Sequence, residues 1–342
     1  MEISQKIKFA VIGCGHIGKR HAGIIQGNSD CALVALCDGK AREDLGLAAF
    51  SDVPFFTSID ELFESKIALD VVVIASPNGY HEAQSLKILD NGCHVVIEKP
   101  MALSKASCER IIFKALQKQK QVFCVMQNRY SPPSVWLKEM VEKRILGDIF
   151  MVQTNCYWNR DDRYYKKGDW HGTKHLDGGT LFTQFSHFID LLYWCFGDIT
   201  NIQAKFNNFS HTHSTDFEDS GFVNFDFVDG GMGSLNYSTA VWEKNLESSI
   251  TIIAENGAVK LGGQYMDEVL YCHIKDNFSY KPAPFEENSA GFSPLREANH
   301  SYVYQNIVGV LKGQQSIATN ALEGLKVVDI IERIYTHLPN LK

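Results

Sequence analysis

Among the side chains that could move a proton at neutral pH, one lysine and one histidine are singled out by the sequence around them. Lys99 stands in the tripeptide Glu98-Lys99-Pro100, which follows the apolar run 95–97. Partial desolvation lowers the pKa of such an amine from about 10.4 towards neutrality, so that it can relay a proton. His187 lies in the apolar stretch 181–196, and its imidazole titrates near neutral pH, which makes it a candidate general base. The residue types alone leave two other interpretations open, a solvated lysine at a strand end and a hydrogen-bonded histidine in the core.

A glycine-rich turn near the N-terminus predicts a dinucleotide site. The apolar run 9–12 meets Gly13, Gly15 and Gly18, and a helical pattern follows. In this fingerprint the first glycine makes a tight turn and the second lets the backbone approach a pyrophosphate. The third allows the helix and the strand to pack closely. The phosphates then bind at the positive end of the helix dipole.

Asp38 indicates which cofactor is bound. It ends the apolar run 32–37, twenty residues beyond Gly18, where a carboxylate accepts hydrogen bonds from the adenosine ribose. A carboxylate at this position repels the extra phosphate of NADP, so NAD is favoured, although Lys40 and Arg42 follow closely. The alternative is a surface turn after a core strand.

The elements that must position these residues alternate between strands and helices. The strand-like segments 69–75, 92–100 and 121–126 are separated by segments of helical pattern, which predicts a doubly wound parallel sheet over residues 1–127. Ligands of such sheets lie outside the carboxyl ends of the strands. The residues that we expect at the cofactor site are Gly13, Gly15, His16, Ile17, Gly18, Asp38, Ser76, Pro77, Asn78, His81, Glu98, Lys99 and Gln127.

The second half of the chain has a different pattern. Residues 150–158 form one long strand pattern, residues 220–227 alternate with period two, and residues 249–261 form a hairpin around Glu255-Asn256-Gly257. We therefore expect an antiparallel sheet in a second domain over residues 128–320. A helix between 181 and 196, capped by Asp177, would cover one face and bring Thr183 and His187 to one side. A second subunit could cover the other face, so a homo-oligomer, a dimer or tetramer, is expected.

Composition restricts the class of protein. The 342 residues exceed a usual single core, and the net charge of −7 argues against a nucleic-acid groove. The sequence has nine cysteines without a CxxC motif, no signal-peptide pattern and no apolar run of about eighteen residues. These features indicate a cytoplasmic protein.

Two further segments are interpreted from their residue types. His211-Thr212-His213 is interpreted as part of a solvated loop rather than a metal pair, since no third ligand is indicated. The helical pattern 321–338 is expected to pack back on the first domain.

Taken together, these motifs resemble the Gfo/Idh/MocA oxidoreductases. The resemblance rests on GxGxxG with Asp38, on Glu98-Lys99-Pro100, on the glycine pair before His187-x-x-Asp190, and on Glu323-Gly324-Leu325-Lys326. It implies an N-terminal Rossmann domain and a C-terminal α+β domain with a large, mostly antiparallel open sheet. It also implies that Lys99 and His187 flank the substrate carbon that faces the nicotinamide.

A finer resemblance points to the branch of this family that oxidises UDP-N-acetylglucosaminuronate at C3, before a transamination in surface polysaccharide (lipopolysaccharide) biosynthesis. It is carried by the segments 127–132, 158–160, 164–165, 170–173 and 176–179. That branch often has Arg where His171 stands and Asn where Thr183 stands. The substrate-binding residues that the resemblance implies are Arg129, Tyr130, Arg160, Tyr165, Trp170, Asp177, Thr183 and His187.

The predicted reaction is NAD-dependent oxidation of a sugar secondary hydroxyl. His187 is favoured as the base, with Lys99 polarising the hydroxyl, and 2-oxoglutarate could recycle the reduced cofactor. Three alternatives remain: an inositol or other sugar dehydrogenase of the same family, an NAD-dependent glycosidase on the same fold, and a non-catalytic NAD-sensing regulator.

Overall fold

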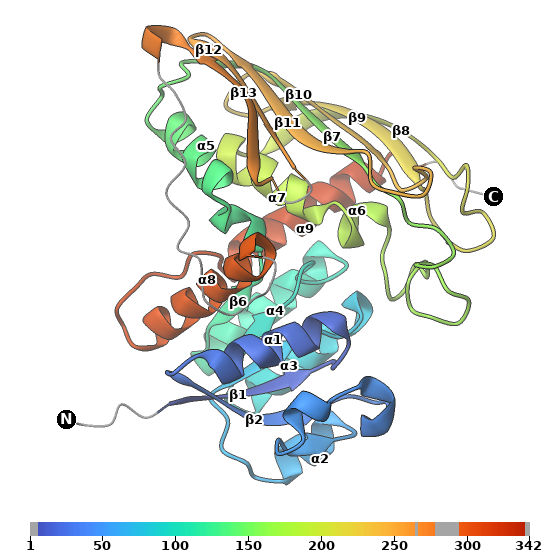
Figure 1. The fold of residues 1–342 in the computed structure, drawn as a ribbon, viewed down its shortest axis with the longest axis vertical. Coiled ribbons are helices and arrows are strands. Elements are labelled where there is room, and N and C mark those ends of the chain that lie inside the picture. Colours follow the sequence, from blue (N-terminus) through green and yellow to red (C-terminus); the bar gives the residue numbers. More distant parts are fainter. Residues whose placement is uncertain (1–5, 264–265, 278–293, 339–342) are drawn as a thin grey trace. The chain divides into compact units, whose positions relative to one another are not determined.

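The computed structural model describes residues 6–263, 266–277 and 294–338. The chain forms two compact units (Figure 1). The first contains Met1–Met126 and His300–Val328, and the second contains Gln127–Asn299 and Asp329–Lys342.

The first unit is built on a six-stranded parallel sheet with the strand order β3-β2-β1-β4-β5-β6. The strands are β1 (Ile7–Ile12), β2 (Cys31–Cys37), β3 (Phe55–Phe56), β4 (Val71–Ile74), β5 (His94–Ile97) and β6 (Val122–Cys124). All four side chains of β4 are completely buried, because helices cover both faces of a parallel sheet. This confirms the doubly wound fold that the sequence predicted.

The helices of the first unit are α1 (His16–Gly27), α2 (Ile59–Glu64), α3 (His81–Asp90) and α4 (Lys105–Lys118), with the 3₁₀ turns η1 (Arg42–Leu45), η2 (Ala48–Phe50) and η3 (Asn78–Tyr80). Ser58 and Ser104 cap α2 and α4, each accepting a hydrogen bond from a backbone N–H of the first turn. Helix α8 (Pro294–Leu311) joins this unit from His300 onwards.

Helix α9 (Ala321–Tyr335) contributes residues to both units. In the first unit Gly324 lies so close to β6 that an added Cβ would be 2.5 Å from Cys124 Sγ. In the second unit Arg333 donates to the carbonyl oxygen of Ile199. We expected this helix to pack on the first domain. Its residues up to Val328 belong to the first unit, and those from Asp329 onwards belong to the second.

The second unit contains a seven-stranded sheet with the order β13-β12-β11-β7-β10-β9-β8. The strands are β7 (Ile149–Tyr157), β8 (Ile199–Asn207), β9 (Ser220–Phe227), β10 (Met232–Ser238), β11 (Glu247–Ala254), β12 (Gly257–Gly262) and β13 (Glu268–Ile274). Only the pair β7 and β10 is parallel, which confirms a mostly antiparallel sheet.

Helices α5 (Pro132–Glu142), α6 (Thr180–Thr183) and α7 (Ser186–Phe196) lie on one side of this sheet (Figure 1). Phe185 packs its ring 5.2 Å from the ring of Trp158 and 5.5 Å from that of Tyr237, and so joins the start of α7 to the sheet. On the other face Phe222, Met232 and Ile253 are 62%, 55% and 46% exposed. Within the described residues, no helix is both long and apolar enough to cross a membrane.

The expected single helix over 181–196 is wrong, because Gln184 and Phe185 interrupt it between α6 and α7. The expected cap is also wrong. Gly179, with φ of 133°, is the N-cap of α6, and no side chain caps the helix there. Asp177 cannot act as the cap because its carboxylate accepts hydrogen bonds from Thr183 Oγ1 and from the backbone N–H of Gly172.

A completely buried carboxyl group joins α9 to the sheet in the second unit. Glu218 Oε1 accepts hydrogen bonds from Tyr237 Oη at 2.8 Å and Tyr335 Oη at 2.7 Å. Tyr335 Oη in turn accepts from the backbone N–H of Leu181 in α6 at 2.9 Å. Burial raises the pKa of Glu218 to about 7.

We predict that Glu218→Gln becomes more stable than the natural protein as the pH rises. Between pH 4.5 and about 7 the unfolded chain loses the Glu218 proton while the folded chain keeps it, so the folded state of the natural protein is progressively destabilised. Since one pKa unit corresponds to about 1.4 kcal/mol, the variant should gain on the order of 3 kcal/mol relative to the natural protein. Urea unfolding at pH 5 and pH 8 measures this, with the exposed Glu64→Gln as control. Equal pH dependence of both proteins would contradict the prediction.

Candidate functional site

The turn between β1 and α1 has the geometry of a phosphate cradle. Gly13 has φ of 86°, and an added Cβ would lie 2.6 Å from the backbone of Ala75 and Ser76. A Cβ on Gly18 would lie 1.7 Å from the carbonyl oxygen of Gly13, so only glycine allows this approach of helix and strand. Gly15, at the N-cap of α1, has no atom within 4 Å of an added Cβ among the described residues. That open space beside a helix N-terminus fits a pyrophosphate group.

Asp38 follows β2 and is held in a fixed orientation. Its Oδ2 accepts from the backbone N–H of Cys14 at 2.7 Å, and its Oδ1 accepts from the backbone N–H of Lys40 at 2.9 Å. Arg42 turns away from it and donates to the carbonyl oxygens of Phe50, Ser51 and Val53. The guanidinium is therefore used inside the fold, and Asp38 stays a prediction as the carboxylate that favours NAD over NADP.

His81 ties the loop after β4 to the loop after β5. It is completely buried, with Nδ1 2.8 Å from the carbonyl oxygen of Pro100 and Nε2 3.0 Å from that of Ser76. Burial lowers the pKa of His81. We expected His81 at the cofactor, and the structure gives its ring two backbone partners of the protein instead. Ser76 Oγ donates to Gln84, and Asn78 is buried in η3.

Glu98 is surrounded by imidazoles rather than exposed at the strand end. Its Oε1 lies 2.8 Å from His21 Nε2 and 3.8 Å from His300 Nε2. Burial alone would raise the pKa of Glu98, but the two imidazoles hold it well below its usual range. Oε2 accepts from the backbone N–H of Lys99 at 3.1 Å, so the buried carboxylate fixes the backbone from which the half-buried Lys99 extends. Lys99 is followed by a cis peptide bond to Pro100.

In the second unit His187 lies at the start of α7 and is 8% exposed. Gln127, in the 3₁₀ turn η4 (Gln127–Tyr130), places its Nε2 3.1 Å from His187 Nε2. Two residues after Gln127, Arg129 meets Asp190, which follows His187 by three residues. Arg129 Nε lies 2.9 Å from Asp190 Oδ2, and Nη2 lies 2.6 Å from Oδ1.

This pairing differs from the predicted role of Arg129. We expected Arg129 to bind the substrate, but its guanidinium is paired with a carboxylate of the protein, and both residues are buried. The guanidinium also lies 5.4 Å from the ring of Trp194. The sequence motif cannot tell an arginine that binds the substrate from one that pairs with a carboxylate of the protein. A guanidinium forms the same two hydrogen bonds with a carboxylate of either kind.

Arg160 lies three residues after the end of β7 and is half-buried. Its Nε donates to Gln184 Oε1 at 2.7 Å, and Gln184 Nε2 donates to Tyr164 Oη at 2.7 Å. The guanidinium lies 4.8 Å from the ring of Trp158. Gln184, which sequence reasoning missed, thus connects Arg160 to the segment that carries His187.

The other expected substrate residues divide into buried and accessible groups. Tyr165 is 4% exposed and packs edge-on against His211 and Phe217. Asp177 and Thr183 are buried and hydrogen-bonded to each other. Trp170 is half-buried and stacks on His171 with 3.9 Å between ring centroids, and Tyr130 is also half-buried. No group of side chains suited to hold a metal ion occurs in the described part of the chain.

Two glycine substitutions should separate cofactor binding from folding. Gly15→Ala should leave the melting temperature of the cofactor-free protein unchanged and weaken NAD binding at least tenfold, because its methyl group enters the space reserved for the pyrophosphate. Gly18→Ala should lower the melting temperature, since its Cβ overlaps the Gly13 carbonyl. Gly23→Ala, in an open position of the same helix, is the control for NAD titration and thermal unfolding. Unchanged NAD affinity in Gly15→Ala would contradict the cradle.

A substitution that breaks the pair of Arg129 with Asp190 should lower the stability of the folded protein. Arg129→Met leaves the Asp190 carboxylate buried without its main partner, and this should cost about 3–5 kcal/mol of unfolding free energy. The double variant Arg129→Met/Asp190→Leu should recover part of that loss, because no buried charge is left. Denaturant unfolding measures both. A normal stability combined with a raised KM would instead restore Arg129 as a substrate residue.

Comparison with known proteins gives the family. The model of the oxidoreductase family with an NAD-binding Rossmann fold matches residues 7–126, and that of the GFO/IDH/MocA C-terminal domain matches residues 135–260. The structure is similar to the WlbA dehydrogenase of Bordetella pertussis in complex with NADH and UDP-GlcNAcA, with 30% identity, a TM-score of 0.85, and 97% of this chain and 96% of that chain covered. It is also similar to the WlbA dehydrogenase of Chromobacterium violaceum in complex with NADH and UDP-GlcNAcA, with 29% identity and a TM-score of 0.85. That match covers 99% of this chain and 98% of the other chain.

The chain is also similar to a curated relative, the D-glucoside 3-dehydrogenase of Escherichia coli K12. It is 28% identical over 150 residues, which are 44% of this chain and 43% of the relative. The match thus spans less than half of either protein. Since the two family models together span most of the chain, it belongs to the Gfo/Idh/MocA family and is an NAD-dependent sugar or polyol oxidoreductase.

Proposed function

We propose that the protein oxidises C3 of UDP-N-acetylglucosaminuronate with NAD, in the synthesis of a surface polysaccharide. The observation that carries the proposal is the likeness over nearly the whole chain to two dehydrogenases crystallised with NADH and UDP-GlcNAcA. The segments that contain Arg160 and Trp170, which are among those that carried the finer sequence resemblance, support the same assignment.

The chain's own residues divide the work as follows. The N-terminus of α1 and Gly15 would hold the pyrophosphate of NAD, and Asp38 would hold the adenosine ribose. The nicotinamide, when bound, supplies the acceptor for the substrate hydride. His187 takes the proton of the substrate hydroxyl, with its ring oriented by the amide of Gln127. Lys99 polarises that hydroxyl and anchors the cofactor ribose.

Substrate binding falls to the accessible groups. Arg160 fits the uronate carboxylate, since a guanidinium matches an oxyanion with two parallel hydrogen bonds. Trp170, stacked on His171, offers an aromatic surface to a sugar ring. Arg129 is omitted because it holds Asp190.

A second candidate is oxidation of C3 in a glycoside that carries no nucleotide. The E. coli relative named D-glucoside 3-dehydrogenase favours it. Turnover of UDP-N-acetylglucosaminuronate and of methyl glucosides, measured side by side as NADH formation, separates the two. A preference for the methyl glucosides would discard the nucleotide-sugar assignment and keep the dehydrogenase.

We further propose that the protein is a homo-oligomer through the exposed face of the large sheet. Phe222, Met232 and Ile253 lie on three strands of that face, β9, β10 and β11, and burying them against a second copy removes apolar surface from water. Recycling of NADH by 2-oxoglutarate is compatible with this proposal and can be assayed in the same experiments.

We predict that Lys99→Met and His187→Phe each lower kcat by about 10²–10⁴-fold, the usual effect of removing a positioned proton-transfer group. His187→Phe should leave NAD affinity unchanged, because the cofactor cradle belongs to the first unit. Lys143→Met, an exposed lysine of the second unit, is the control. Full turnover in Lys99→Met or His187→Phe would refute the proton-transfer roles.

A further inference from the structure

The second unit contains a pocket that shares one residue, Arg160, with the residues assigned to the proposed reaction. It has a volume of about 670 Å³, within the range of small-molecule sites. Its walls come from the segment after β7, the loop 210–213 and the segment after β10. Its charged side chains balance, three basic (Arg160, Arg163 and Lys244) against three acidic (Asp161, Asp162 and Glu243). Such a lining suits a neutral group rich in hydroxyls better than a diphosphate.

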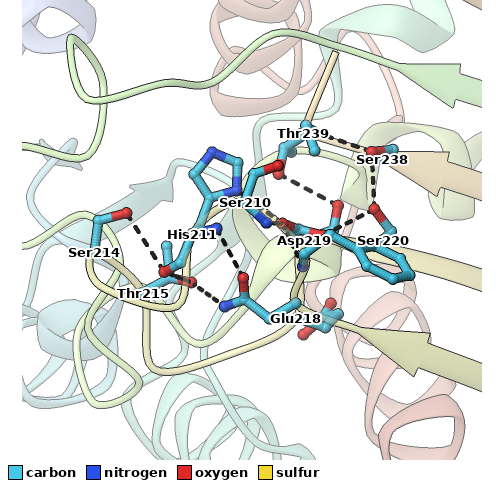
Figure 2. A network of polar contacts seen from close by, with 12 residues as sticks. Ser210, His211, Ser214, Thr215, Glu218, Asp219, Ser220, Ser238 and Thr239 are labelled. Carbon is cyan, nitrogen blue, oxygen red and sulfur yellow. Dashed lines mark hydrogen bonds and ion pairs between the residues drawn. The ribbon is translucent and has the colours of Figure 1, made fainter. Parts of the chain in front are cut away.

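His211 lines this pocket, and one of its two ring nitrogens is paired with a carboxylate of the protein. We interpreted residues 211–213 as a solvated loop, and for His211 that is wrong, since it is 4% exposed. Its Nδ1 lies 3.1 Å from Asp219 Oδ2 (Figure 2). His213, two residues on, behaves as predicted, with 64% of its side chain exposed.

Asp219 is a strongly held carboxylate. Its Oδ2 also accepts from the backbone N–H groups of Phe209 at 3.0 Å and Ser210 at 2.7 Å, and its Oδ1 accepts from Ser220 Oγ at 2.8 Å (Figure 2). Burial would raise the pKa of Asp219, but the hydrogen bonds from His211 and its neighbours hold it below the usual value. In the tautomer that donates to Asp219, the ring proton of His211 lies on Nδ1. Nε2, which has no hydrogen-bond partner in the described ranges, is then an acceptor for a ligand donor.

The pocket and the candidate site share Arg160. Arg160 belongs to the wall of the pocket and donates to Gln184, which precedes His187 by three residues. Trp242, 83% exposed, lines the same pocket and offers a free indole face. Aromatic faces stack on nucleobases regardless of sequence.

We propose that this pocket binds the nucleoside half of the substrate, with His211 Nε2 accepting a hydrogen bond from a ribose hydroxyl and Trp242 stacking on the base. The inference rests on the proposed function, because it requires a substrate that extends beyond the reacting sugar. It makes His211 and Trp242 the residues that distinguish a nucleotide sugar from the sugar alone.

His211→Phe is a clean test because the ring contact with Tyr165 can persist and Asp219 keeps three of its four hydrogen-bond donors. For this variant the KM for UDP-N-acetylglucosaminuronate should rise about tenfold, the value of one hydrogen bond. The kcat should stay within about twofold, and kcat/KM for N-acetylglucosaminuronate 1-phosphate should not change. Trp242→Ala, too exposed to disturb folding, should weaken binding similarly. His175→Ala, an exposed loop histidine outside the pocket, is the control.

Calorimetric titration of uridine separates this inference from the proposed function. Uridine should bind the natural protein and bind His211→Phe and Trp242→Ala about tenfold more weakly, whether or not the nucleotide sugar is oxidised. If the nucleotide sugar is not turned over but uridine binds in this way, the proposed function fails and the pocket assignment stands. If uridine does not bind, or binds all variants equally, the pocket assignment is overturned.

Discussion

The buried ion pair between Arg129 and Asp190 is the contact on which the candidate catalytic geometry of the second unit depends. Each partner lies two or three residues from a residue of that site, Gln127 before Arg129 and His187 before Asp190. A bidentate pair fixes both distance and orientation, so it sets the register between η4 and α7 and thereby the contact of Gln127 with His187. An isolated buried pair adds little net stability. Its value here lies in positioning.

In the first unit, the position of α1 depends on a close approach of two backbone segments. The absence of a Cβ at Gly18 lets α1 approach the Gly13 carbonyl, and this places the helix N-terminus at the carboxyl end of β1. Behind the strand ends, His21 and His300 keep the Glu98 carboxylate ionised in the interior, and that carboxylate holds the backbone N–H of Lys99. The buried His21, His300 and Glu98 thereby help to fix the backbone from which Lys99 extends.

Periodicity and turn signals predicted both sheets, and short motifs carried the resemblance to the family, because all these signals are local in the sequence. The break at Gln184 and Phe185 was not predictable from an apolar run, since it arises from contacts with Arg160 and Trp158, which lie about 25 residues earlier. The partner of Arg129 and the burial of His211 are likewise set by tertiary contacts, with Asp190 and with Asp219. In each case the sequence identified a polar residue of the right type but could not tell whether a ligand or the protein satisfies it.

In the proposed reaction a hydride leaves C3 of a nucleotide sugar and passes to NAD bound in the first unit. UDP-N-acetylglucosaminuronate deuterated only at C3, with mass spectrometry of the cofactor after a single turnover, follows this hydride directly. We expect reduced cofactor that carries one deuterium, and unlabelled reduced cofactor from substrate deuterated at C4 instead. Deuterium transfer from C4, or no reduction with either substrate, would contradict the proposed reaction.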